Sequence, residues 1–264
     1  MRISVYKFLC MVFIFSIPLQ SSAWGVLGHR IVGEVAETYL TKKAKKNIAA
    51  ILGNESVAMS SNWADFVKSD STYDFMYNWH FINLPGGLSE KAVREYLAQD
   101  TLTDIYTRIK FCTEQLKRKD LDISSKQVYL KALIHFVGDL HQPMHVGRYD
   151  DLGGNRIKLN WFRSPSNLHQ IWDEKLIEFQ QLSYTEYTKA INFCSTAQKK
   201  IWQSDPLETW VYESYSIAQL LYAGISESGE SLSYKYNYDH VATLNQQLLK
   251  AGVRLAGLLN EIFG

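Results

Sequence analysis

Three histidines and one aspartate within eleven residues, from His135 to His145, restrict what this chain can form. His135 and Asp139 are four residues apart, and side chains at that spacing lie on one face of a helix. Pro143 cannot sit inside a regular helix, so the helix is predicted to end near Leu140. His145 then follows on the next turn. Because the chain has only 7 histidines, this concentration indicates a site for one metal ion or for two neighbouring ions.

A second pair, His169 and Asp173, repeats the spacing of four. Imidazole and carboxylate groups are good zinc ligands, and helical proteins build metal sites from inward-facing positions of this kind. One such pair also occurs by chance on many helices, and a single histidine is more often an ordinary core or surface residue. Two pairs together with His145 favour a metal site.

The first residues have the pattern of a secretory signal peptide. Two basic residues precede a short apolar run over 8–17, and small residues occupy 21–23. The run is too short to cross a membrane, so we predict a signal peptide over 1–23 that is removed after Ala23. The alternative is a buried or anchoring N-terminal helix. No later run is long enough to span a membrane, and the pattern predicts a secreted or periplasmic protein without a stable membrane anchor.

The charge balance argues against broad electrostatic binding of nucleic acid. The chain has 28 basic and 27 acidic residues, and loss of the two basic residues of the signal leaves 26 against 27. A protein that binds through a wide basic surface is usually more positive, so any positive charge for phosphates must be local. Two cysteines remain, Cys112 and Cys194. An exported protein could join them, but the sequence does not decide it.

Hydrophobic periodicity predicts an all-α protein with one domain over 24–264. Only two segments read as extended: the aromatic stretch 77–83, and 157–161, where Ile157, Leu159 and Trp161 alternate with polar residues in the manner of a short β-ribbon. The predicted helices cover 29–40, 42–52, 60–68, 89–99, 103–119, 124–140, 168–180, 185–203, 206–223 and 238–263.

The order of short motifs resembles the trinuclear zinc nuclease family, the group of mung bean nuclease, within the superfamily that includes zinc-dependent phospholipase C. The matching pieces span most of the chain after the signal: Trp24-Gly25 with Gly28-His29, Trp63-Ala64-Asp65, Trp79-His80-Phe81, His135-Phe136-Val137-Gly138-Asp139, Gln142-Pro143-Met144-His145, Gly153-Gly154-Asn155, and Leu168-His169 with Trp172-Asp173. As a set in this order they are highly specific. The resemblance implies a multi-helix phospholipase C/nuclease-like fold.

The resemblance also implies nine ligand residues for three Zn²⁺ ions. The first ion would be held by Asp65, His80, His135 and Asp139, the second by His145, His169 and Asp173, and the third by the Trp24 amine and carbonyl, His29 and the shared Asp139. A free α-amine titrates near pH ~8, so it can lose its proton to a metal near neutrality. Zinc acidifies bound water and stabilises phosphoryl charge, which is the chemistry of phosphodiester hydrolysis.

Four positions match those that the family uses around its substrate. Lys68 and Asp65 would act in catalysis, Lys68 on a phosphate oxygen and Asp65 on the attacking water. Phe81 would stack on an unpaired base, and Asn155 would hydrogen-bond phosphate or base. The ordinary alternatives are a surface lysine, a core phenylalanine and a turn asparagine. Asn83 replaces an aspartate of the fungal members; an amide both donates and accepts, so the resemblance does not fix the base preference.

The resemblance implies an endonuclease that hydrolyses single-stranded DNA and RNA to 5′-phosphorylated products and also removes 3′-phosphates from nucleotides. Its partners would be single-stranded nucleic acid and 3′-nucleotides, and we expect a monomer. The alternatives are a zinc-dependent phospholipase C on the same scaffold and a metal-binding protein without catalysis. Of the remaining histidines, His141 could contact a metal ligand or be exposed, and exposure is the favoured expectation; His240 is expected to be structural.

Overall fold

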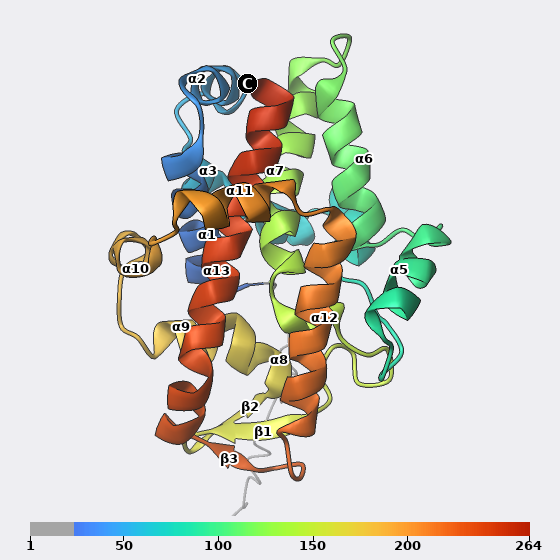
Figure 1. Cartoon of the computed structure of the whole chain (residues 1–264), viewed down its shortest axis with the longest axis vertical. Coiled ribbons are helices and arrows are strands. Elements are labelled where there is room, and N and C mark those ends of the chain that lie inside the picture. Colours follow the sequence, from blue (N-terminus) through green and yellow to red (C-terminus); the bar gives the residue numbers. More distant parts are fainter. Residues whose placement is uncertain (1–23) are drawn as a thin grey trace, which may run out of the picture.

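The structure, a computed structural model, describes residues 24–264. The predicted signal peptide lies outside the described residues. The longest helix, α13 (Tyr234–Phe263), runs along most of the molecule, and α1 (Val26–Tyr39) packs along it (Figure 1). The first described helix is thus fixed against the last one, and both lie beside the central helix α7 (Ile123–Leu140).

Further helices surround these three. The longer ones are α2 (Lys42–Leu52), α5 (Glu90–Ala98), α6 (Ile105–Lys117), α10 (Tyr184–Ile191), α11 (Thr196–Ser204) and α12 (Leu207–Ala223). The short turns are α3 (Val57–Ser60), α4 (Trp63–Phe66), η1 (Val67–Ser69), η2 (Ser71–His80), η3 (Pro143–Val146), α8 (Leu168–Gln170), η4 (Ile171–Lys175) and α9 (Leu176–Glu178). The predicted all-α class is confirmed.

Helix α7 begins where the sequence supplies a cap and ends in the core. The Asp122 side chain accepts a hydrogen bond from the Ser125 backbone N–H, which satisfies one of the unpaired donors of the first turn. From Ala132 to Leu140 every residue is buried. A helix that is buried on all sides must contact neighbours in every direction, and His135 and Asp139 therefore lie inside the protein rather than on its surface.

A small three-stranded sheet lies at the end of the molecule opposite α2 (Figure 1). Strand β1 (Lys158–Trp161) pairs antiparallel with β2 (Ser164–Asn167), with Lys158 opposite Asn167. A third strand, β3 (Ser231–Leu232), pairs parallel with β1. The predicted ribbon at 157–161 is present, and its second strand leads directly into α8, which carries His169.

Two predicted segments are wrong in detail. The stretch 77–83 is not extended throughout: it is a 3₁₀ helix to His80 and becomes extended from Phe81, where the Ile82 N–H donates to the carbonyl of His145 at 2.9 Å. The predicted helix 185–203 is two helices. It breaks because Ser195 forms a capping box with Gln198, which starts a new helix within the predicted one.

The two remaining cysteines are free thiols, with Cys112 buried and Cys194 partly exposed. The sequence did not decide whether these two cysteines pair, and in the structure they do not form a disulfide. Within residues 24–264, no helix combines the length and the apolar character needed to cross a membrane.

A buried carboxyl group at the start of α6 predicts a pH-dependent stability. Burial and the neighbouring Asp100 raise the pKa of Asp104 to about 7. The folded state then binds the proton more tightly than the unfolded chain, so this stabilisation is complete below about pH 4 and is lost as the pH rises through 7. Asp104→Asn removes the titration but keeps an oxygen for the Thr107 N–H that Asp104 now caps.

We expect the stability of Asp104→Asn relative to the unsubstituted protein to increase by about 2 kcal/mol between pH 5 and pH 8. Urea unfolding of both proteins at the two pH values measures their free energies of unfolding. Titrations that are common to both proteins cancel in the difference between them. A difference that does not change with pH would contradict the assignment.

Candidate metal centre

Four predicted ligands from different parts of the chain meet at one point. Asp65 is on α4, His80 ends η2, and His135 and Asp139 lie one turn apart on α7. The spacing prediction for α7 is confirmed, because His135 Nε2 lies 3.1 Å from Asp139 Oδ2. The 3₁₀ turns of η2 deliver His80 from a segment more than fifty residues away, with its Nδ1 only 2.9 Å from the same carboxylate oxygen.

The facing atoms of these four side chains have the spacing of a tetrahedral ligand set. His80 Nδ1 and His135 Nε2 are 3.1 Å apart, and each lies within 3.1 Å of Asp139 Oδ2. Asp65 Oδ1 is 3.9 Å from His80 Nδ1 and 3.6 Å from His135 Nε2. Ligands of a tetrahedral zinc ion are roughly 3.3 Å from one another, given metal–ligand bonds of about 2.0–2.1 Å. The set therefore fits a metal ion at its centre.

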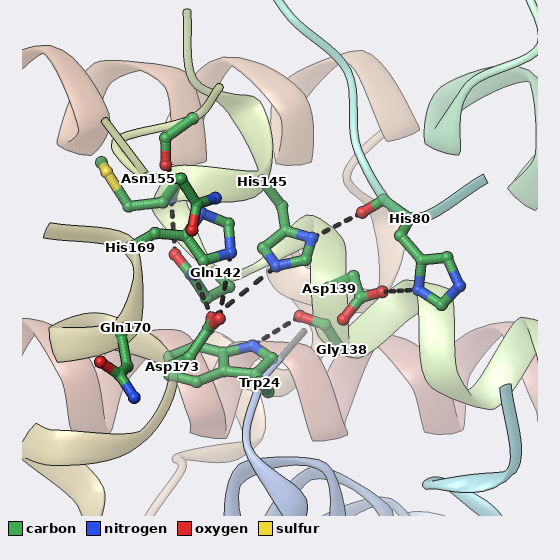
Figure 2. Close-up of polar contacts among 12 residues, drawn as sticks. Trp24, His80, Gly138, Asp139, Gln142, His145, Asn155, His169, Gln170 and Asp173 are labelled. Carbon is green, nitrogen blue, oxygen red and sulfur yellow. Dashed lines mark hydrogen bonds and ion pairs between the residues drawn. The ribbon is translucent and has the colours of Figure 1, made fainter. Parts of the chain in front are cut away.

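The other oxygen of Asp139 faces a different histidine. His29 Nε2 on α1 lies 3.2 Å from Asp139 Oδ1, and its ring stacks on His135 with centroids 3.8 Å apart. Gly138 makes this stacking possible, since a Cβ there would lie 2.9 Å from His29 Nδ1. One buried carboxylate thus presents one oxygen to each of two groups of ligands, as Figure 2 shows in part for the His80 side.

A second group lies beside the first, with His145 on η3, His169 on α8 and Asp173 on η4. His169 Nε2 is 3.0 Å from Asp173 Oδ2, and His145 Nε2 is 3.7 Å from Asp173 Oδ1. Asp173 sits in a single π-helical turn where the sequence predicted a continuous helix. Such turns occur often at functional sites, because they re-aim side chains without ending the helix.

Backbone carbonyls fix the orientation of three imidazoles. The Nδ1 atoms of His135, His145 and His169 hydrogen-bond to the carbonyls of Ser61, His80 and Gly153 at 2.6–2.7 Å. A carbonyl can only accept, so Nδ1 must carry the proton, and in the neutral ring the Nε2 lone pair faces the carboxylates. This is the arrangement that orients histidine ligands in metal sites.

Unsatisfied atoms support the same conclusion. His29 Nε2, Asp139 Oδ1 and His145 Nε2 are buried without a hydrogen-bond partner. Buried polar atoms are almost always satisfied, and metal ions would satisfy these three, one ion between His29 and Asp139 and another at His145. Three groups of histidines and aspartates have ligand atoms close enough to share an ion, and the first two have His135 in common: His29, Asp65 and His135; His80, His135 and Asp139; and His145, His169 and Asp173.

The charges of the centre are strongly coupled. Burial opposes ionisation of Asp139, yet His135 and His145 hold its pKa well below the ordinary value. Burial also opposes protonation of His145, but Asp139 and Asp173 raise the pKa of His145 to about 9. Burial lowers the pKa of His80 to about 4. Buried carboxylates here require positive charge nearby, and protons on histidine supply what metal ions would supply more strongly.

Gln142 has a role that the sequence did not reveal. It is fully buried, its amide nitrogen donates to Asp173 Oδ1, and its oxygen accepts from the backbone N–H of Met144 (Figure 2). It therefore holds Asp173 in place between His145 and His169. Its only signal in the sequence was its position at the start of the motif Gln142-Pro143-Met144-His145. The carbonyls that orient the histidines have no sequence signal at all.

Trp24 is completely buried beside α7. Its indole N–H donates to the carbonyl of Gly138 at 2.7 Å (Figure 2). The next residue, Gly25, donates its N–H to the carbonyl of Asp173 at 2.8 Å. The chain at this point is thus anchored next to Asp139 on one side and next to the second ligand group on the other. The ligand role of the Trp24 amine and carbonyl stays a prediction.

The predicted substrate residues line a cleft of about 520 Å³ whose lining includes the predicted metal ligands His80, His145 and His169. Lys68 lies in it with its Nζ 2.6 Å from Asp65 Oδ1. Phe81, Asn83 and Asn155 line it as well. Phe81 and Asn83 face the cleft together because the backbone is extended there, so the alternate residues Ile82 and Leu84 point into the core.

His141 was expected to be exposed, and that prediction is wrong. Its ring is fully buried, with Nδ1 bonded to the carbonyl of Val137 and Nε2 lying 3.0 Å from Nη1 of Arg254 on α13. It is directed away from the ligands, towards α13. His240 packs against Trp172 and Tyr236, in agreement with a structural role.

Comparison with known proteins agrees with the motifs. The family model described as "S1/P1 Nuclease" matches residues 24–264. The chain is 32% identical to "Endonuclease 2" of Arabidopsis thaliana, an alignment that covers 91% of each protein. It is 30% identical to "Nuclease P1" of Penicillium citrinum, over 91% of this chain and 98% of that protein, and 28% identical to "Nuclease S1" of Aspergillus oryzae, over 90% and 91%.

Proposed function

The chain belongs to the S1/P1 nuclease family, and we propose that it is a zinc-dependent endonuclease that hydrolyses single-stranded DNA and RNA and leaves 5′-phosphates. We further propose that it removes 3′-phosphates from nucleotides. The observation that carries the proposal is Asp139, whose two buried oxygens face different sets of histidines. A carboxylate in this position can join two metal ions, and a pair of neighbouring ions can stabilise both the attacking and the leaving oxygen of a phosphodiester.

The proposed centre holds three zinc ions. The first would have the four-residue set around Asp139 Oδ2, and the second would have His145, His169 and Asp173. The third would have His29, Asp139 Oδ1 and the amine and carbonyl of Trp24. When bound, zinc supplies an acidified water and neutralises charge on phosphoryl oxygens.

The chain's own side chains would position the substrate and the water. Lys68 is held at the edge of the centre by Asp65, with its ammonium group in the cleft, where it can contact a phosphate oxygen. Asp65 is partly buried next to His135 and Lys68, and both lower its pKa although burial raises it, so it remains an ionised acceptor that can orient water.

The cleft fits an unpaired nucleotide. The ring of Phe81 is half-buried and packs edge-on against the exposed Tyr77, which leaves aromatic surface on the cleft wall. A base in a duplex has both faces covered by stacked neighbours, whereas an unpaired base can stack on such a ring. Asn83 and Asn155 would add hydrogen bonds to base or phosphate. This supports single-stranded rather than double-stranded substrates.

The proposal includes export. The pattern of residues 1–23 favours a signal peptide removed after Ala23, which would leave Trp24 as the first residue of a secreted or periplasmic, monomeric enzyme. Removal of the signal would create the α-amine that the third ion needs. Activity would therefore depend on export and cleavage.

The function is tested with the mature protein that begins at Trp24. We expect initial rates on single-stranded DNA to be at least about 100-fold higher than on duplex DNA, to vanish on chelation and to return with zinc. Phosphatidylcholine is the comparison substrate, since a phospholipase C shares the ligands. Cleavage of the lipid with no nucleolysis would replace this proposal by the phospholipase, and bound zinc without turnover of either would indicate a metal-binding protein.

A further inference from the structure

The cleft contains two positive side chains that the proposed reaction does not use. Apart from Lys68, the basic residues along its lining are Arg156 and Lys158, and the one acidic residue along the lining is Asp74. Lys68 is committed to Asp65. Arg156 and Lys158 are two residues apart and both exposed, so their charge faces the cleft and solvent rather than the core.

Neither side chain is neutralised by a carboxylate within the described part of the chain. Arg156 Nη1 donates to the backbone carbonyl of Asp150 at 2.9 Å, and Lys158 Nζ donates to that of Asn155 at 3.0 Å. These bonds hold the side chains near the loop but leave their net charge, since a carbonyl is neutral. A guanidinium has five N–H donors and an ammonium three, so most remain available for another acceptor.

The backbone ties both residues to the metal centre. Lys158 pairs with Asn167 across the hairpin, and Asn167 caps the helix that carries His169. The loop before Arg156 contacts the same histidine through the carbonyl of Gly153. Gly153 has φ +60°, and a Cβ there would lie 2.4 Å from the carbonyl of Met144, so this close approach of the loop requires glycine. The backbone that carries the two cations is therefore tied to the second ligand group.

We infer that Arg156 and Lys158 form a second phosphate subsite, which binds a phosphodiester next to the one being cleaved. The inference rests on the proposed function. Two adjacent cations in a cleft suit an anionic backbone that continues beyond the metal ions, and a 3′-mononucleotide has no second phosphate to place there. The subsite would make the enzyme favour oligonucleotides over mononucleotides at physiological salt.

The test compares Arg156→Ala/Lys158→Ala with a control of equal charge change, Lys45→Ala/Lys46→Ala. The control residues are exposed on α2, at the end of the molecule opposite the sheet (Figure 1). The cleft variant is expected to have a KM for single-stranded DNA that is raised about ten-fold and an unchanged kcat. The slope of log(kcat/KM) against log[salt] should become less steep by about 0.7–1.4. Its kcat/KM for a 3′-mononucleotide should change less than two-fold. Arg156→Lys/Lys158→Arg should restore most of the salt dependence.

A second measurement locates the contact. A tetranucleotide in which one phosphate beside the scissile linkage is a neutral methylphosphonate should bind the unsubstituted protein about ten-fold more weakly, but the cleft variant equally with or without the replacement.

The outcomes separate the two proposals. If the unsubstituted protein does not cleave single-stranded DNA, the proposed function fails. Two results would refute the second subsite while the function stands. In the first, the cleft variant has the salt dependence of the control; in the second, it loses 3′-mononucleotide hydrolysis as much as hydrolysis of single-stranded DNA.

Discussion

Replacing Asp139 by asparagine is expected to lower nuclease activity by at least about 10³-fold and to reduce bound zinc by more than one ion per molecule. Each oxygen of Asp139 faces a separate group of ligands, with His80 and His135 at one oxygen and His29 at the other. An amide keeps one neutral oxygen and replaces the other by a nitrogen that cannot bind a metal. Of the two ions that would share the carboxylate, one would lose its ligand atom and both would lose the negative charge.

The measurement is zinc content by mass spectrometry together with initial rates on single-stranded DNA. Asp120→Asn, an exposed carboxylate paired with Arg118, is the matched control and should retain all zinc and full activity. Because Asp139 is completely buried, circular dichroism must show that the variant is folded. Full zinc occupancy in a folded Asp139→Asn protein would disprove the bridging role, whatever its rate.

The clustering of the predicted ligands could be anticipated from the sequence because local spacing and motif order indicate it. His135 with Asp139, and His169 with Asp173, are near each other in any helix, and the structure needs only to aim them inward. Most predicted helices are present for the same reason: their caps and apolar spacing are local. The two groups of side chains around Asp139 come together only because α1, η2 and α7 meet. The family resemblance implied that Asp139 is shared, whereas hydrophobic periodicity alone did not.

What escaped prediction depends on contacts distant in the sequence. His141 was expected to be exposed, yet Arg254, which is 113 residues away on α13, contacts its ring. Arg254 is itself fully buried, and Glu213 and Asp205 neutralise it at 2.7 Å each. No local sequence pattern predicts this buried network of charged side chains. The role of Gln142 was missed for the same reason, since Asp173 is 31 residues away.

The break between α10 and α11 was missed although its signal is local. Its signal was local, a serine followed three residues later by glutamine, but it lay inside a longer helical pattern that masked it. The π turn at Asp173 was also unpredictable, because the sequence of a π turn resembles that of an ordinary helix.

A mature protein with one additional glycine before Trp24 is expected to bind two zinc ions rather than three and to lose activity by roughly 10²- to 10³-fold. The extension converts the α-amine into an amide, whose nitrogen has no lone pair to offer a metal, whereas a free amine with a pKa near ~8 loses its proton readily to zinc. Trp24 cannot move away to compensate, because it is buried and held by Gly138 while Gly25 is held by Asp173.

Trp24→Phe with the natural start of the mature chain is the matched control. It loses the indole bond to Gly138 but keeps the α-amine, so it should retain three zinc ions and most activity while unfolding at a lower temperature. Zinc content, kcat on single-stranded DNA and thermal unfolding are compared for the three proteins. Three zinc ions and an unchanged kcat in the extended protein would exclude the amine as a ligand. Loss of the third ion in Trp24→Phe alone would assign the effect to the indole instead. The expected pattern, loss on extension and retention in Trp24→Phe, would mean that the enzyme acquires its full metal centre only when the residues before Trp24 have been removed.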